Sequence, residues 1–247
     1  MTLSLRRLTL AVLAVLATVA GLLAAATTAN ARSAVGHGPV HRLVHATSSN
    51  WAGWDNTGST YTKVSASWVQ PTITCAKRET SYASFWIGLD GDGSGSVEQT
   101  GSEGDCVRGT PKYYSWYEFY QAYPVNYSNT VRPGDHFSST VTSTGGGNYT
   151  LVLTDSTQGW THTTNGSAPS GRNASAEVIA EAPSSNRGVL PLANFGTMNF
   201  TNATVNGAAL GTVPTPQKIT MASASTTKAS VSNLTNNTDF SVTWHHA

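Results

Sequence analysis

Two glutamates in one short segment are the first residues whose types and spacing suggest chemistry. Glu177 and Glu181 stand four positions apart in the run 176–181, whose small and apolar neighbours fit a β-strand. Both side chains point to one face of such a strand, but at about 3.3 Å per residue they lie roughly 13 Å apart. Glycosidases place two carboxyl groups about 5–9.5 Å apart across the bond that they cleave. The pair is therefore too wide to act alone.

A third glutamate, Glu118, keeps a carbohydrate function open. Glu118 and Glu181 come within the required range if their strands are neighbours, and the sequence does not decide this point. The chain also has 7 Trp and 9 Tyr residues, which could stack against sugar rings. A carbohydrate-binding or glycoside-hydrolysing β-sandwich is therefore one function that the residues allow.

The run Asp90–Gly95 is similar to the first half of a calcium-binding loop. It fits the pattern D-x-D-x-S-G, yet position twelve is Gly101, where the loop requires a glutamate, and no flanking helix is expected. The chain also lacks G-x-S-x-G, H-E-x-x-H, the phosphate-binding loop and the dinucleotide fingerprint. We therefore expect no metal ion and no cofactor, and no motif supports a histidine-based mechanism.

The elements that position these residues are predicted to be strands. From Ser48 onward, short segments rich in Val, Thr and aromatic residues alternate with turn sequences such as Asn206-Gly207, and no amphipathic helix of three turns occurs. About 200 residues of this kind are typical of one antiparallel sandwich, so we expect a single domain at 48–247. Strands are predicted at Val64–Val69, Ser84–Leu89, Tyr113–Tyr120, His136–Ser143, Tyr149–Thr154, Ala176–Ala180, Gly196–Thr201 and Phe240–Trp244.

Residues 1–31 have the pattern of a signal peptide. Arg6 and Arg7 precede an apolar run from Leu8 to Ala26, and Ala29-Asn30-Ala31 is the small-x-small pattern of a cleavage site. No second apolar run follows, which favours export over a membrane anchor. Residues 32–47 are interpreted as a short pro-segment or a linker. We expect a secreted, extracellular monomer that has no membrane contact once the signal peptide is removed.

The two cysteines, Cys75 and Cys106, are expected to form one disulfide. An even number of cysteines in an exported chain favours pairing, and two cysteines alone make an incomplete metal site. Closing a loop of this length stabilises the fold by about 3–4 kcal/mol in the chain-entropy treatment.

The charge of the chain excludes nucleic acid as an expected partner. Without residues 1–31, twelve of the 14 Lys+Arg residues remain against 13 Asp+Glu, which gives a formal charge of −1. No basic patch is present to neutralise a row of phosphates. Charged residues make up 11% of the chain, against about 25% in ordinary soluble domains. A surface solvated mainly by hydroxyls and amides changes its charge little in acid.

Six segments, read in order, resemble the glutamic peptidases, also called eqolisins. Gln99-Thr100-Gly101 matches the Q-T-G that holds the family's catalytic glutamine, and Glu181 ends a run similar to its N-x-A-E-x-I-x-E pattern. The resemblance extends from about Ser48 to Asn206. The other segments are Ser49–Gly53, similar to S-N-W-x-G; Trp86–Asp92, similar to W-V-G-I-D-G-D; Trp116–Tyr120, similar to W-Y-E-W-Y; and Pro191–Thr197, similar to P-F-A-D-F-G-T.

The resemblance implies a two-sheet antiparallel β-sandwich, a concanavalin-like jelly roll, with a substrate cleft on one bent sheet. It also implies an endopeptidase that cleaves protein or peptide substrates in acid, without metal, cofactor or covalent intermediate. As a carboxylate, Glu181 can take a proton from water and later give one to the leaving nitrogen. The Gln99 amide, which is neutral at every working pH, can donate to the developing oxyanion.

The resemblance further bears on substrate preference, on the role of the disulfide and on the residues that border the cleft. Tyr114 stands where the family often has an acid, so we expect a different substrate preference on that side. Gln99 lies inside the loop that the two cysteines close, and we expect the disulfide to help hold Gln99 opposite Glu181. The candidate substrate-binding residues are Trp51, Trp86, Asp90, Trp116, Glu118 and Tyr120.

Overall fold

A computed structural model of the chain describes residues 47–247. The predicted signal peptide, and residues 32–46 of the predicted pro-segment or linker, lie outside the described residues. The described part is built from strands, with one short 3-10 helix, η1 (Leu210–Thr212). The prediction of an all-β fold is therefore confirmed. None of the helical structure in this part is long and apolar enough to span a bilayer.

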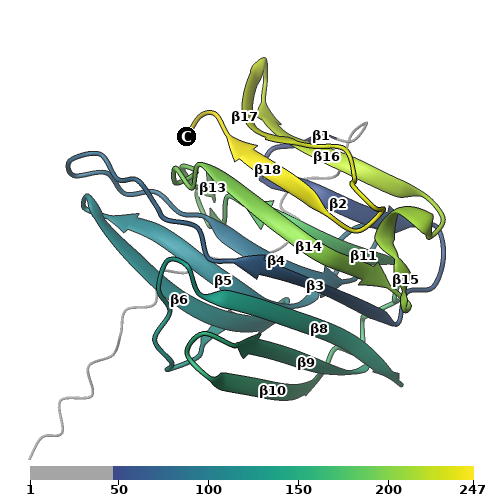
Figure 1. The fold of residues 1–247 in the computed structure, drawn as a ribbon. Helices are drawn as coiled ribbons and strands as arrows, with labels where there is room; N and C mark the ends of the chain where they lie inside the picture. The colour runs from purple at the N-terminus through teal and green to yellow at the C-terminus, as the bar shows by residue number, and fades with distance from the viewer. Residues whose placement is uncertain (1–46) are drawn as a thin grey trace, which may run out of the picture. The chain divides into compact units, whose positions relative to one another are not determined.

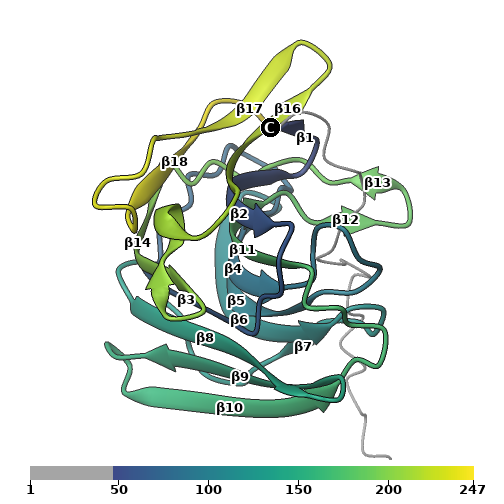
Figure 2. The same ribbon diagram turned by 90° about the vertical axis from the view of Figure 1, so that its right-hand side faces the viewer.

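The strands form two layers that pack face to face (Figures 1 and 2). Every pairing between strands is antiparallel except that of β1 with β16, and β16 pairs with both β2 and β17, which joins the layers. One layer, called here the β5 sheet, runs in the order β16 (Pro216–Ser223), β2 (Trp51–Thr57), β11 (Ser175–Glu181), β4 (Ser84–Leu89), β5 (Glu98–Val107), β6 (Thr110–Phe119) and β7 (Val125–Asn126).

The second layer is called here the β14 sheet. Two short strands extend it, and a separate hairpin of β12 (Ser184–Ser185) and β13 (Gly188–Val189) follows β11 in the chain. The order in the β14 sheet is β10 (Trp160–Ser167), β9 (Asn148–Asp155), β8 (His136–Gly145), β3 (Lys63–Val69), β14 (Thr197–Val205), β18 (Phe240–Trp244) and β17 (Thr226–Val231), with β1 (Thr47–Ser48) on β16 and β15 (Ala208–Ala209) on β14.

Each strand predicted from the sequence coincides with an observed strand to within a few residues, and five longer strands were missed. The missed strands are β2, β5, β10, β16 and β17. Of these, β5 matters most for the site, because it carries Gln99. Its sequence, EQTGSEGDCV, has few of the β-branched and aromatic residues that favour strands. It is nevertheless paired along its length with β6 and, over its first six residues, with β4.

The main core lies between the two sheets. Alternation along β4 points Phe85, Ile87 and Leu89 into this core, where all three are fully buried. Trp68 of β3 crosses the core and donates its indole N–H to Ser102 Oγ of β5 at 2.8 Å. The even-numbered residues of β5 therefore face the core, and the odd-numbered residues face the other side of the sheet.

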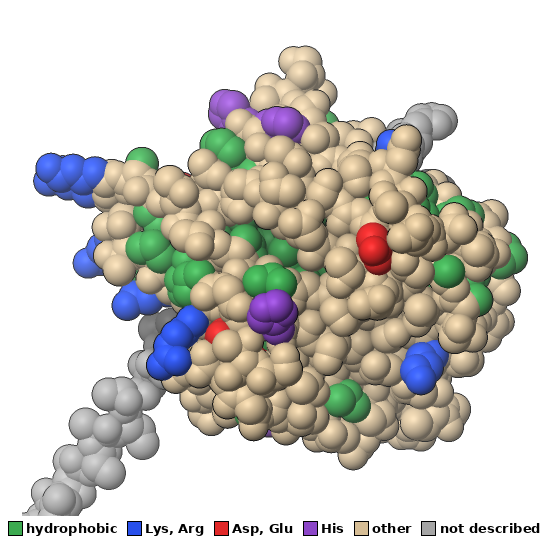
Figure 3. Space-filling model, in the orientation of Figure 1, with side chains coloured by type: hydrophobic (Ala, Val, Ile, Leu, Met, Phe, Trp, Pro, Cys, Tyr) green, Lys and Arg blue, Asp and Glu red, His purple; other side chains and the backbone are tan. Residues whose placement is uncertain are grey.

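Burial of acidic side chains is the unusual property of this fold. Ten of the 13 Asp and Glu residues are buried, whereas acidic residues are almost never fully buried in ordinary proteins unless they are paired. The face drawn in Figure 3 accordingly shows few red side chains among the tan ones. The ten are Asp55, Asp90, Glu98, Glu103, Asp105, Glu118, Asp135, Asp155, Glu177 and Glu181.

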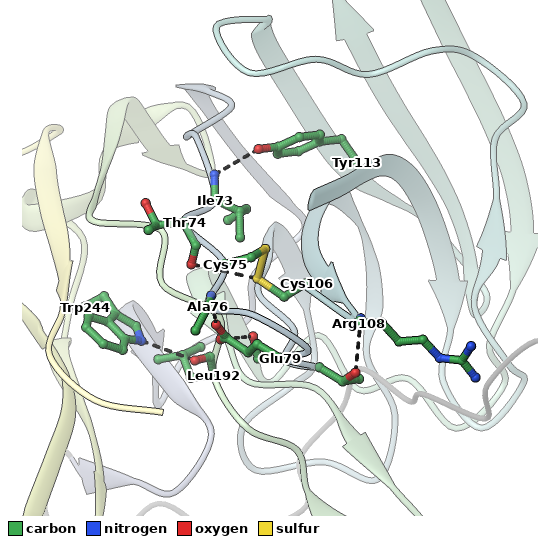
Figure 4. The surroundings of a disulfide bond; sticks show 12 residues. Ile73, Thr74, Cys75, Ala76, Glu79, Cys106, Arg108, Tyr113, Leu192 and Trp244 are labelled. Carbon is green, nitrogen blue, oxygen red and sulfur yellow. Dashed lines mark hydrogen bonds between the residues drawn. A yellow bond between two sulfur atoms is a disulfide. The ribbon is translucent and has the colours of Figure 1, made fainter. Parts of the chain in front are cut away.

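The disulfide predicted from the sequence is confirmed, between Cys75 and Cys106 (Figure 4). Cys106 is the penultimate residue of β5, and Cys75 belongs to the segment that links β3 to β4. The backbone N–H of Ile73 donates to the Tyr113 hydroxyl of β6 at 2.9 Å, which ties the same segment to the next strand. A covalent bond thus attaches the C-terminal end of β5 to the segment between β3 and β4, in addition to the backbone hydrogen bonds that pair this end with β6.

Candidate active site

The face of the β5 sheet that points away from the main core carries a second apolar cluster. Side chains alternate along a strand, so residues two apart share a face. Glu181 is two residues from Ile179, Gln99 two from Val97, and Glu118 two from Trp116, and all three polar residues therefore lie on the face of this cluster. The cluster consists of Trp51, Trp86, Val97, Trp116, Ile179 and Ile219, with Tyr114 and Tyr120 packed against it.

The strand registers arrange this face in three consecutive cross-strand rows. In the strand order β11, β4, β5, β6, they are Glu181–Ser84–Glu103–Tyr114 (the Glu181 row), Ile179–Trp86–Gly101–Trp116 (the tryptophan row) and Glu177–Gly88–Gln99–Glu118 (the Gln99 row). Strands β4 and β5 separate β6 from β11. The strands of Glu118 and Glu181 are therefore not neighbours, and the condition set for a glycosidase pair is not met.

Glu181 is a buried carboxylate held by two N–H donors. Asn50 Nδ2 donates to Glu181 Oε1 at 3.1 Å, and Trp86 Nε1 donates to Oε2 at 2.8 Å. Ser48 Oγ donates to Asn50 Oδ1 at 3.1 Å and so fixes the orientation of the amide. Hydrogen bonds from N–H groups favour the ionised form of a carboxyl group. The two bonds hold the Glu181 carboxyl group in one orientation on this face of the sheet.

Gln99 is held by the strand on its other side. Its Nε2 donates to Glu118 Oε2 at 2.7 Å, and the two residues stand directly opposite each other on β5 and β6. Both side chains are buried. An amide nitrogen carries two hydrogens, so this bond engages one of them and sets the direction of the other.

Trp86 links the two polar residues across the sheet. Its Nε1–H reaches Glu181, and its ring carbon Cζ3 lies over Gly88, where an added Cβ would be 3.0 Å from Cζ3 and 3.2 Å from Gln99 Cβ. The edge of Trp51 meets the Trp86 ring, with centroids 5.2 Å apart and planes at 75°. One indole therefore contacts the Glu181 carboxylate at one end and runs toward Gln99 at the other.

The glycine of Gln99-Thr100-Gly101 is needed for this placement of Trp86. A Cβ on Gly101 would lie 2.2 Å from the Phe85 carbonyl oxygen and 2.7 Å from Trp86 Cβ. Real Cβ atoms do not approach other atoms so closely, so any side chain at this position would push β4 and β5 apart.

Asp90 is the one candidate that does not belong to this face. Its carboxylate accepts hydrogen bonds from the backbone N–H groups of Arg172, Asn173 and Ala174, at 2.7–2.9 Å, and from the Tyr149 hydroxyl at 3.1 Å. These bonds fasten the turn after β4 to the segment before β11. Asp90 therefore holds the turn in place, and its substrate-binding role stays a prediction.

Three buried acids on this face were missed by sequence reasoning: Asp55 of β2, which pairs with Glu177, and two acids of β5. Glu103 follows Gln99 by four positions on β5, and Asp105 by six, so both point to the same side. Burial raises the pKa of Glu103 well above its usual value, and the charge of Asp105 adds to the rise. Burial also raises the pKa of Asp105 to about 7, although a 2.9 Å hydrogen bond from the Tyr114 hydroxyl opposes the rise. The alternation of acids at 103 and 105 was the available signal, and it is informative only once β5 is known to be a strand.

Metal ligation has no support in the side chains of residues 47–247, where no group of three or more His, Cys, Asp and Glu residues could hold an ion.

Known proteins match the chain over nearly all of this sandwich. The Peptidase A4 family model matches residues 49–244. Aspergillopepsin-2 from Aspergillus niger is 32% identical over 189 residues, which are 66% of this chain and 67% of that protein.

Two solved structures share the fold. Scytalido-glutamic peptidase with a transition-state analogue inhibitor has a TM-score of 0.69 and 24% identity, over 80% of this chain and 98% of its own. SCP-B, a peptidase of the eqolisin family in complex with the tripeptide Ala-Ile-His, has a TM-score of 0.65 and 25% identity over the same shares. Together with the family match across the whole sandwich, these likenesses show that the chain belongs to the Peptidase A4 family and is a glutamic endopeptidase.

Proposed function

We propose that Glu181 and Gln99 are the catalytic pair of this endopeptidase and that it works in acid. The observation that supports the pair best is the setting of Glu181, a buried carboxylate with two N–H donors. The Trp86 indole extends from this carboxylate toward Gln99 on the same face of the sheet. A base and an amide donor thus share one buried, rigid surface.

The proposed reaction uses water as the nucleophile. Glu181 takes a proton from the water as the water oxygen attacks the peptide carbonyl carbon, and it later gives this proton to the leaving nitrogen. Gln99 Nε2 donates to the oxyanion that forms on the carbonyl oxygen. Glu118 accepts the other hydrogen of this amide and keeps the donor in place. No metal, cofactor or covalent intermediate takes part.

Acid conditions suit this chemistry. A free glutamate titrates near about pH 4.3, so a glutamate base functions in a medium where a histidine would be fully charged and unable to accept a proton. Burial raises the pKa values of Glu98, Glu103 and Glu177, so these buried acids are also accommodated most easily where they are protonated.

The aromatic residues around the pair are proposed to bind the substrate. Trp51, Trp86 and Trp116 belong to the apolar cluster on this face, and Tyr120 packs against it. Glu118 borders them through its bond to Gln99. The solved eqolisin SCP-B holds a tripeptide, and here we propose that peptide segments of protein substrates lie across these residues, in a cleft that remains a prediction.

Hydrolysis of denatured casein at about pH 3–4, near the free carboxyl pKa values, tests the pair. We expect Glu181→Gln to lose nearly all activity and Gln99→Ala to lose about 10²–10³-fold in kcat. The matched control is Glu177→Gln on the same strand. Burial raises the pKa of Glu177 well above its usual value, so its carboxyl is already neutral in this range and the variant should retain activity.

Three outcomes would count against the proposal. Activity that survives in Glu181→Gln rejects the base, and inhibition by chelators or pepstatin rejects the mechanism. Inactivity toward casein together with release of reducing sugar from a glucan would instead support the carbohydrate alternative.

We also propose that the protein is exported and that residues 1–31 are removed. The Cys75–Cys106 disulfide supports export, because disulfides persist in oxidising compartments. N-terminal sequencing of the protein recovered from a culture medium should begin near Arg32, or near Ser48 if the segment 32–47 is also cleaved. Retention of the full chain inside the cells would contradict export.

A further inference from the structure

The outer face of the β14 sheet carries a hollow of about 340 Å³ that the proposed function does not use. Trp68 of β3 points into the main core, so alternation along the strand turns Ser67 and Val69 to the outer side. Glu181 and Gln99 lie on the other sheet, and the main core separates them from this hollow. Side chains of three adjacent strands line the hollow: Ser67 and Val69 of β3, His136 and Ser138 of β8, and Asn199 and Asn202 of β14.

A β-bulge in β14 shapes the hollow. The register of β14 against β3 shifts between Thr201 and Thr204. Asn202, inside this shift, has a φ of 55°, a left-handed conformation that asparagine adopts more readily than most residues. Its backbone N–H donates to Asp239 Oδ1 at 2.9 Å, which fixes the bulge. Bulges bend a strand and redirect a side chain, and here the exposed Asn202 side chain becomes part of the wall of the hollow.

The polar side chains of the hollow are available to a ligand. Within residues 47–247, the structure shows no hydrogen bond to the side chains of Asn199, Asn202, His136, Ser67 or Ser138. Four of these five residues are exposed, and Ser67 is half-buried. An amide or a hydroxyl group both donates and accepts hydrogen bonds. The hollow therefore matches a ligand whose own groups also do both, as the hydroxyl groups of a sugar do.

The charge of the hollow favours a neutral ligand. His136 is the one ionisable side chain that lines it, and no Asp, Glu, Lys or Arg takes part. Val69, which is 43% exposed, adds an apolar contact beside the amides. A sugar ring has the matching combination, with hydroxyl groups around its edge and C–H groups on its faces. The volume lies near the lower end of the range of about 300–1,000 Å³ for small-molecule sites, which suits one sugar unit.

Two uncharged rows of side chains extend from the hollow across the same face. Nine of their ten residues are Ser or Thr, and the tenth is Val152. Neighbouring strands are about 4.8 Å apart, so each row is roughly 19 Å long. Figure 3 views the molecule from the side of this sheet, and tan side chains predominate there. The rows are Thr201–Ser67–Ser138–Thr154–Thr161 and Thr204–Ser65–Thr140–Val152–Thr163.

We propose that the hollow and the two rows bind a neutral polysaccharide, with one sugar unit seated between Asn199, Asn202 and Val69. The rows continue the site in one direction, so an extended chain of sugar units fits the face better than a single free sugar. Because the catalytic pair lies on the opposite side of the sandwich, the bound polymer leaves the peptidase face open. The site thus holds the enzyme on a polysaccharide matrix while protein substrates reach the other face.

Surface plasmon resonance on an immobilised glucan, mannan and galactan, with anionic alginate for comparison, tests the proposal. The protein is produced in a host that lacks N-glycosylation, because Asn199 and Asn202 both stand in N-x-T sequences. We expect binding to at least one of the three neutral polymers, with the same affinity at low and high salt. Binding to none of them overturns the inference, and so does binding to alginate alone that disappears in salt.

Variants of the hollow locate the binding. Asn199→Ala and Asn202→Gly each remove one amide, and glycine keeps the positive φ of the bulge. Each should weaken binding by about 2- to 10-fold, as expected for one lost hydrogen bond. The matched control is Asn236→Gly, at an exposed residue with the same φ of 55° on the loop between β17 and β18. It should bind like the wild type.

Binding that is unchanged in both hollow variants, or that weakens equally in Asn236→Gly, overturns the inference. Casein hydrolysis should be the same in all these proteins, because the altered residues lie away from the catalytic pair. A wild type that binds the polymer but does not cleave casein would refute the proposed function and leave this site standing.

Discussion

Glu98 links the stability of this fold to acid conditions, and replacing it provides a quantitative test. Glu98 begins β5 and points to the main-core side of the sheet, opposite to Gln99, where it is fully buried. Burial, and then the charge of Asp90, raise its pKa from an ordinary 4.5 to about 8. Between these two pH values the folded protein keeps a proton that the unfolded chain has lost.

The sign and size of the effect follow from proton linkage. The stabilisation is fully present below pH 4.5, where both states are protonated, and it is lost progressively as the pH rises toward about 8. Each pH unit in this window costs about 1.4 kcal/mol, which amounts to roughly 3 kcal/mol between pH 4.5 and 7. Domains of this size are stable by about 5–15 kcal/mol in total, so one residue controls a large part of the stability.

Urea unfolding of the wild type and of Glu98→Gln at pH 4.5 and pH 7 measures this contribution. We expect the free energy of unfolding to fall between the two pH values by roughly 3 kcal/mol less in the variant, because glutamine does not titrate. Glu79→Gln, a change of the same kind at a partly exposed loop residue, should keep the wild-type difference. Equal pH dependence in Glu98→Gln and the wild type would refute the assignment.

Three further predictions concern the site and its support. Trp86→Phe removes the N–H that donates a hydrogen bond to Glu181. Because a hydrogen bond to a charged group contributes about 1.5–3 kcal/mol, kcat/KM should fall by about 10- to 100-fold. The far-ultraviolet circular dichroism spectrum should stay unchanged. Gly101→Ala places a Cβ against the Phe85 carbonyl, and thermal unfolding should show a loss of at least about 2 kcal/mol. Removing the disulfide by replacing both cysteines with Ser should cost about 3–4 kcal/mol in urea unfolding. Activity should fall at least as readily as stability, because the bond anchors the strand that carries Gln99.

The sequence predicted the strands whose residues favour extended structure and missed those that do not. Segments such as Ser84–Leu89 are buried, apolar and aromatic, and local pattern was sufficient to identify them. The order of strands in the sheet joins residues far apart in the chain, as with β11 beside both β2 and β4. No local pattern specifies such neighbours, so the sequence could not exclude a Glu118–Glu181 pair.

The candidate site was predictable only as far as ordered motifs allowed. Glu181 and Gln99 were chosen by resemblance, since one carboxyl among 13 and one amide among many carry no local mark. The contacts of Asn50 and Trp86 with Glu181 depend on the registers of β2 and β4 against β11. Registers are fixed by packing across the whole sheet, so these contacts became visible only in the folded chain.

The composition of β5 and the proposed acid working range have one physical cause. Alternation sends Glu98 toward the main core and Glu103 and Asp105 to the face of Glu181, so this strand buries acids on both of its sides. Burial raises the pKa of Glu98 to about 8 and that of Glu103 well above its usual value, so both carboxyl groups are accommodated most easily when they are neutral, and the strand is most stable in acid. Glu98→Gln should therefore reduce the dependence of stability on pH without altering the opposite face of the strand, which carries Gln99.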